Sequence, residues 1–72
     1  MNNNQHPLRR WRLDNGVRQI DVAVMLNVSL SVVKKWEQGR SQPNLKMLKE
    51  IKKATRYESL PVEWILWFCF RG

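Results

Sequence analysis

The segment from residue 19 to residue 38 constrains the fold more than any other part of the chain. It reads QIDVAVMLNVSLSVVKKWEQ, and its apolar residues recur at the spacing of two short helices separated by residues 27–29. The β-branched residues of the first half would also allow a strand. However, Val22, Ala23 and Leu26 fall on one helical stripe. The segment therefore predicts two short helices joined by a tight turn.

This pair of helices meets the requirements of a helix-turn-helix unit. A small residue must lie midway along the first helix, where the second helix crosses it closely, and Ala23 occupies that position. The turn needs a residue that tolerates a positive φ, which Asn27 does. Ser29 is a favourable N-cap for the second helix. The apolar anchors toward a common core come from both helices and the turn: Val22, Leu26, Val28, Val33 and Trp36.

The rest of the chain predicts three more helices. One covers about residues 7–14, one covers 45–55 after a cap at Asn44, and the last begins near Pro61. The predicted fold class is therefore all-α, a compact bundle of about five short helices with the helix-turn-helix formed by the second and third. The expected organisation is a disordered leader at 1–6, a helix-turn-helix domain at 7–56, and an apolar helix of the same domain at 57–72.

Charge and hydropathy limit the partners. Thirteen Lys and Arg residues against six Asp and Glu leave a net charge of +7 on 72 residues. Such a surface favours polyanions, nucleic acid before an anionic membrane. The longest apolar stretch, 64–70, is far shorter than the about 20 residues of a membrane-spanning helix. Since the N-terminal residues also lack the apolar region of a signal peptide, we expect a cytoplasmic protein without a membrane partner.

Residue types needed for catalysis do not occur as a set. His6 is the only histidine and lies in the polar N-terminal segment, whereas Cys69 is the only cysteine and ends an apolar run. The six carboxylates are scattered, and the three glycines form no phosphate-binding loop. We therefore expect no enzyme activity, no metal, no cofactor and no small-molecule ligand.

The run GVRQIDVAVMLNVSLSVVKKWEQGRSQPNLKMLKEI resembles the lambda-repressor-like (Cro/CI-type, XRE family) helix-turn-helix domain. The resemblance covers about residues 8–56 and lies in these elements: Gly-apolar-x-Gln at 16–19, Ala23, apolar-Ser at 28–29, apolar-x-x-Trp-Glu-x-Gly at 33–39, and Pro43. Two positions depart from the family pattern, because Asn27 replaces the usual turn glycine and Arg18 the usual Thr or Ser. The resemblance implies a regulator of transcription that binds double-stranded DNA.

The resemblance also implies that the second helix of the pair enters the major groove. If Val33 and Trp36 point inward, a rotation of about 100° per residue turns the opposite face outward. The residues predicted to read bases are Gln19, Leu30, Ser31, Lys34 and Lys35. Among them Gln19 is carried over from the family, as a phosphate and base-edge contact, and Lys34 fits a phosphate contact as well as a base contact. The residues predicted to hold phosphates are Arg18, Ser29, Gln38, Arg40, Asn44 and Lys46.

Glu37 lies beside the DNA-reading face but carries the wrong sign for DNA. Its angle on the helix turns it toward the first helix, and the resembling family pairs this glutamate with an arginine at the position of Arg12. We therefore predict a structural ion pair between Arg12 and Glu37.

The C-terminal segment is apolar on every side of its predicted helix. It either closes the core, with Trp64, Ile65 and Phe68 inward, or leaves an apolar patch that meets a partner, because a small monomer cannot bury all of it. We expect Cys69 to be buried. The residues predicted to form a homodimer are Trp64, Leu66, Trp67, Phe68 and Phe70.

Three functions remain open at this point. The leading hypothesis is a stand-alone repressor of phage or plasmid type that binds a palindromic operator as a dimer, with half-sites about 34 Å apart. The second is an antitoxin or adaptor whose C-terminal aromatic segment binds another protein. The third is a nucleic-acid binder that uses charge alone, without sequence preference.

Overall fold

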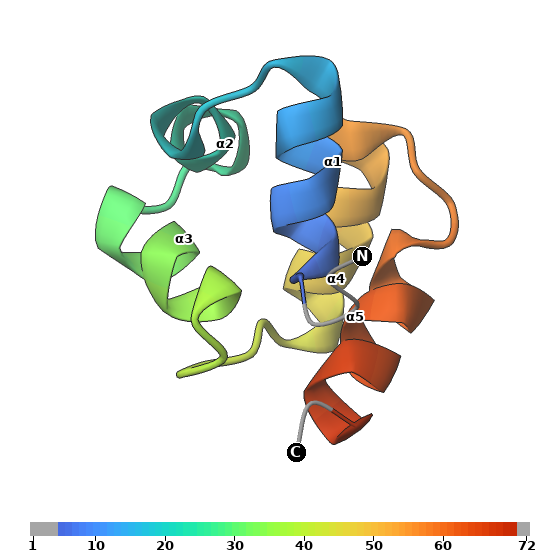
Figure 1. Ribbon diagram of the computed structural model, residues 1–72. Helices are drawn as coiled ribbons and strands as arrows, with labels where there is room; N and C mark the ends of the chain where they lie inside the picture. The colour runs from blue at the N-terminus through green and yellow to red at the C-terminus, as the bar shows by residue number, and fades with distance from the viewer. Residues whose placement is uncertain (1–4, 71–72) are drawn as a thin grey trace.

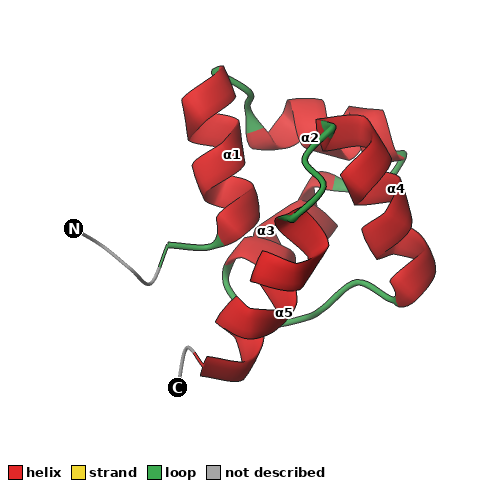
Figure 2. Ribbon diagram, turned by 90° about the vertical axis from the view of Figure 1, so that its right-hand side faces the viewer, coloured by secondary structure: helices red, strands yellow, loops and turns green. Residues whose placement is uncertain are grey.

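The computed structural model describes residues 5–70, which form five helices joined by loops without a strand (Figures 1 and 2). The helices are α1 (Pro7–Asn15), α2 (Gln19–Leu26), α3 (Leu30–Glu37), α4 (Leu45–Thr55) and α5 (Leu60–Phe70). The predicted all-α class with five short helices is confirmed.

Local capping sets the helix ends. The Ser29 hydroxyl accepts from the Val32 N–H at 3.3 Å at the start of α3, and Asn44 Oδ1 accepts from the Met47 N–H at 2.8 Å at the start of α4. These contacts satisfy backbone donors that have no partner within the helix. Asn27 ends α2 with a φ of 57°, the left-handed conformation predicted for the turn.

The helices surround one core. In Figure 1, α2 and α3 lie on one side of α1, whereas α4 and α5 lie on the other side. Packing joins α2 to α3, α1 to α5, and α4 to both α2 and α5. The fully or nearly fully buried apolar residues are Leu8, Val22, Ala23, Val33, Trp36, Leu48, Ile51, Leu60 and Trp64. Trp36 of α3 meets Trp64 of α5 edge-to-face, with 5.6 Å between ring centroids, so the two halves of the bundle are in direct contact.

His6 is not part of a disordered leader, which corrects the sequence prediction at this residue. Its Nδ1 accepts from the Leu8 N–H at 3.1 Å and caps α1, and its ring is buried against Trp64 and Trp67 at centroid distances of 4.4 and 4.5 Å. The prediction was wrong because the aromatic partners lie almost 60 positions further along the chain. Gln5 of the predicted leader is half-buried, and residues 1–4 lie outside the described residues.

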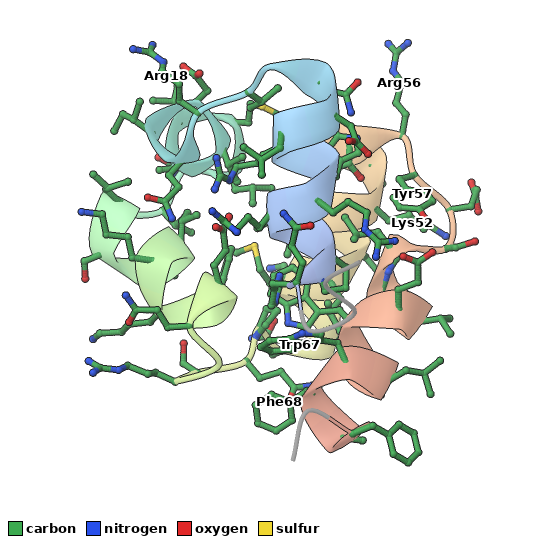
Figure 3. All side chains as sticks on the ribbon, in the orientation of Figure 1. Arg18, Lys52, Arg56, Tyr57, Trp67 and Phe68 are labelled. Carbon is green, nitrogen blue, oxygen red and sulfur yellow. The ribbon has the colours of Figure 1, made fainter. Side chains whose placement is uncertain are left out.

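The orientation of α5 corrects several predictions for the C-terminal segment. Trp64 is 0% exposed, so it belongs to the core and not to a contact with another molecule. Trp67 points from α5 toward the start of α1 (Figure 3) and is half-buried, as is Phe68. Ile65 and Cys69 are exposed instead of buried. The reason is helical register, because the stripe through residue 64 that faces the core turns positions 65 and 69 away from it.

Candidate nucleic-acid interface

Four of the five residues predicted to read bases belong to α3, and the fifth, Gln19, begins α2. Val33 and Trp36 are buried and anchor the opposite side of the helix. Ser31, Lys34 and Lys35 are exposed. Leu30 is half-buried at the N-terminal end of the same helix. The helix therefore presents a short, cationic and polar face to solvent, on the side of the molecule away from α4 and α5 (Figure 1).

A buried ion pair fixes α3 relative to α1. Arg12 Nε donates to Glu37 Oε2 at 2.6 Å and Arg12 Nη2 donates to Glu37 Oε1 at 2.8 Å, a bidentate arrangement. The side chains are only 9% and 5% exposed. Arg12 Nη1 also donates to the Val17 carbonyl at 3.1 Å, and this ties the loop before α2 to the same pair. The ion pair expected between Arg12 and Glu37 is therefore formed, and it holds three segments together.

Gln19 extends this network to the first residue of α2. Its Nε2 donates to Glu37 Oε1 at 3.2 Å, and the side chain is half-buried. The start of α2 and the end of α3 are therefore connected through one carboxylate. Gln19 is partly exposed at this point, whereas the Glu37 side chain is only 5% exposed.

Comparison with known proteins agrees with this arrangement. A family model described as helix-turn-helix matches residues 8–60. The chain belongs to the lambda-repressor-like helix-turn-helix family. No curated protein and no solved structure matches the chain at a significant level. The members of this helix-turn-helix family are DNA-binding transcription regulators and not typically enzymes.

Arg18, the departure from the family pattern, begins the first helix of the helix-turn-helix in an unusual way. Asp21 Oδ2 accepts from the Arg18 backbone N–H at 2.9 Å, so the cap comes from inside the helix. The same carboxylate accepts from the Arg18 guanidinium, in two contacts of 3.0 Å, and this guanidinium lowers the pKa of Asp21. Arg18 points outward at the edge of the molecule (Figure 3). A phosphate that binds this guanidinium would therefore share it with the Asp21 carboxylate.

The remaining predicted phosphate contacts of this helix-turn-helix domain follow the turn and the loop after α3. Ser29 and Asn44 are exposed, and each uses its side-chain oxygen as a helix cap. Gln38, Arg40 and Lys46 are exposed. Arg40 and Lys46, together with the lysines of α3, make the surface around α3 positively charged.

Two features of the interface escaped the sequence prediction. The contact between Arg12 and the Val17 carbonyl uses a backbone acceptor, which every residue carries, so the residue type at position 17 could not predict it. Asp21 could have been found, because an acidic residue three positions after the N-cap is the spacing of a capping box. Between residues 5 and 70 there is no cluster of His, Cys, Asp or Glu suited to a metal ion. Within the same range, no helix is long and apolar enough to cross a bilayer.

Proposed function

We propose that the chain is a stand-alone transcriptional repressor of phage or plasmid type, which binds a palindromic operator in the cytoplasm as a homodimer. The observation that carries the proposal is the exposed cationic face of α3, held in place by the buried pair of Arg12 and Glu37. A rigid helix with polar and cationic side chains on its outer face fits into the major groove, and its charge is complementary to that of the DNA.

Separate groups of residues read and hold the DNA in this proposal. Lys35 and Ser31 contact base edges, and a lysine there prefers the O6 and N7 acceptors of guanine. Leu30 packs against a thymine methyl group. Lys34 contacts either a base or a phosphate. The phosphate contacts come from Arg18, Ser29, Gln38, Arg40, Asn44 and Lys46, and they position the helix without reading sequence.

Selection of bound sequences from a random duplex pool tests the proposal. The expected product is a consensus with two-fold symmetry, and the domain should prefer it about 10³-fold or more over unrelated DNA at the same salt concentration. Lys35→Ala should change the preferred base at one position of each half-site. Arg40→Ala is the matched control, because it should weaken all sequences by a similar factor. A pool that yields no consensus would leave only sequence-neutral binding.

The homodimer is proposed through the outer face of α5, which consists of Val62, Ile65, Leu66, Cys69 and Phe70. All five side chains are exposed, and Glu63 is the single charged residue of the whole helix. Leu45 of α4 is also exposed and borders a hollow of about 220 Å³ together with Val62 and Ile65. An apolar surface of this kind on a chain of net charge +7 supports a contact with a second copy.

Paired substitutions test this contact. Leu66 and Leu13 are 50% and 55% exposed, but they lie on different helices. Leu66→Asp should convert the dimer into a monomer in sedimentation analysis, whereas Leu13→Asp should leave the mass unchanged. If the two variants have the same mass in solution, the dimer contact does not lie on α5. Truncation after Ser59 is unsuitable for this purpose, because it deletes Leu60 and Trp64 from the core.

The exposed face of α5 also favours a second candidate function, an antitoxin or adaptor that binds another protein. This alternative predicts a monomer in solution at every concentration. It further predicts that Leu66→Asp abolishes capture of the partner protein while DNA affinity stays the same.

A further inference from the structure

The contact between Gln19 and Glu37 fixes the direction of an amide at the DNA-facing surface. Both oxygens of Glu37 accept from the Arg12 guanidinium, and a carboxylate paired in this way only accepts hydrogen bonds. The group that Gln19 turns toward it at 3.2 Å must therefore be the NH₂ group. The carbonyl oxygen of Gln19 then points away from Glu37.

This direction is held firmly, because Glu37 itself cannot rotate. Both of its oxygens accept from the Arg12 guanidinium, at 2.6 and 2.8 Å, and the side chain is almost entirely buried. Arg12 also holds the Val17 carbonyl, two residues before Gln19. The backbone and the side chain of Gln19 are therefore restrained by one network.

We propose that Glu37 is a positioning residue for base selection. It presents the carbonyl oxygen of Gln19 to the major groove, so that Gln19 selects a base that carries an amino group. This inference rests on the proposed sequence-specific binding of duplex DNA. It adds the class of base that the Gln19 side chain selects.

The chemistry of the groove gives the direction of the selection. Phosphate oxygens only accept hydrogen bonds, so the outward carbonyl oxygen of Gln19 cannot use them. In the major groove, adenine N6 and cytosine N4 donate, whereas guanine O6 and thymine O4 accept. A carbonyl oxygen is therefore attracted by adenine or cytosine and repelled by guanine or thymine. Adenine is the better partner, because the second N–H of Gln19 can donate to its N7.

The experiment compares four chains on a set of duplexes. Once selection has defined the operator, each base pair of a half-site is replaced in turn by the other three, and the affinities are measured by competition. The wild-type chain should show one position, assigned to Gln19, at which adenine or cytosine is preferred roughly tenfold over guanine or thymine. Gln19→Met removes the polar atoms but leaves the ion pair intact. The preference should disappear at that position alone.

Glu37→Met tests the positioning role directly. It removes both acceptor oxygens, so nothing holds the NH₂ group of Gln19 in one direction, and the preference for an amino group should vanish. Glu50→Met is the matched control, since Glu50 lies on the exposed side of α4, and it should change nothing. A role of Glu37 in stability alone would lower the affinity for all four bases equally. Circular dichroism identifies a temperature at which each variant is folded.

Two results would overturn the inference. One is a wild-type preference that survives in Gln19→Met, which can be measured even if Glu37→Met does not fold. The other is a folded Glu37→Met chain that keeps the wild-type preference. If the wild-type chain selects no consensus at all, the proposed function fails first, and this outcome is distinct from both.

Discussion

The buried histidine makes the stability of the domain depend on pH in a range where few other groups titrate. Burial lowers the pKa of His6 from its ordinary value of 6.5 to about 4. The unfolded chain therefore binds more protons than the folded chain between these two values, and stability is lost as the pH falls from about 6.5 to about 4. The loss has a structural cause, because Nδ1 is the acceptor that caps α1, and a protonated ring would place a charge between Trp64 and Trp67.

The magnitude follows from the difference of about 2.5 pH units between the two values. At about 1.4 kcal/mol per unit, the full effect is about 3 kcal/mol, of which about 2 kcal/mol is lost between pH 7 and pH 5. For a domain of this size, the melting temperature should fall by roughly 10 °C over that interval. Thermal unfolding followed by circular dichroism measures this fall directly.

His6→Asn provides the control for this prediction. Asparagine keeps a side-chain acceptor for the Leu8 N–H but does not titrate. The variant should be less stable than the wild-type chain at pH 7, because the contacts with the tryptophans are lost. Between pH 7 and pH 5, however, its melting temperature should change little. A wild-type midpoint that is constant over this interval, or an equal fall in both chains, would show that protonation of His6 does not control the stability in this range.

Three further predictions concern stability. Arg12→Met leaves the Glu37 carboxylate buried without its cation, so the free energy of unfolding in urea should fall by about 3–5 kcal/mol, and a loss below about 1 kcal/mol would argue against a desolvated pair. Asn44→Ala removes the acceptor of the Met47 N–H and should cost about 1 kcal/mol in the same assay, whereas an unchanged midpoint would mean that this cap contributes nothing. Arg56→Gly should raise the melting temperature by a few degrees, because the residue has a φ of 57° at the end of α4, and a lower melting temperature would contradict this account.

Local rules made most of the helix-turn-helix predictable from sequence. The spacing of Val33 and Trp36 already defines the face of α3 that meets the core, and Asn27 and Ser29 mark the turn and the next helix start. These signals act within a few residues of one another, so they are visible in the sequence. The helix-turn-helix family model matches residues 8–60, which include this segment.

Predictions failed where the deciding contact is distant in sequence. His6 is polar and terminal, yet it is buried because Trp64 and Trp67 enclose it. Because α5 is apolar on every side, no face of the helix is marked as the one that packs on the core. The sequence therefore could not show that residue 64 faces the core while residue 69 faces solvent. The side-chain network around Glu37 was predicted only in part, because Gln19 and the Val17 carbonyl join it through tertiary packing.

The packing of α1 against α5 can form only late in the synthesis of the chain. The helix pair α2 and α3 is complete long before Trp64 leaves the ribosome, but Trp36 at the end of α3 finds its aromatic partner only then. Bringing α5 to α1 closes a long loop, and its entropic cost must be met before the contacts form. We therefore expect α1 and α5 to dock against each other last in folding. An unfinished chain would then hold α3 to α1 through the Arg12–Glu37 ion pair but without the contact between Trp36 and Trp64. Chains that already include α5 should therefore bind DNA more tightly than unfinished ones.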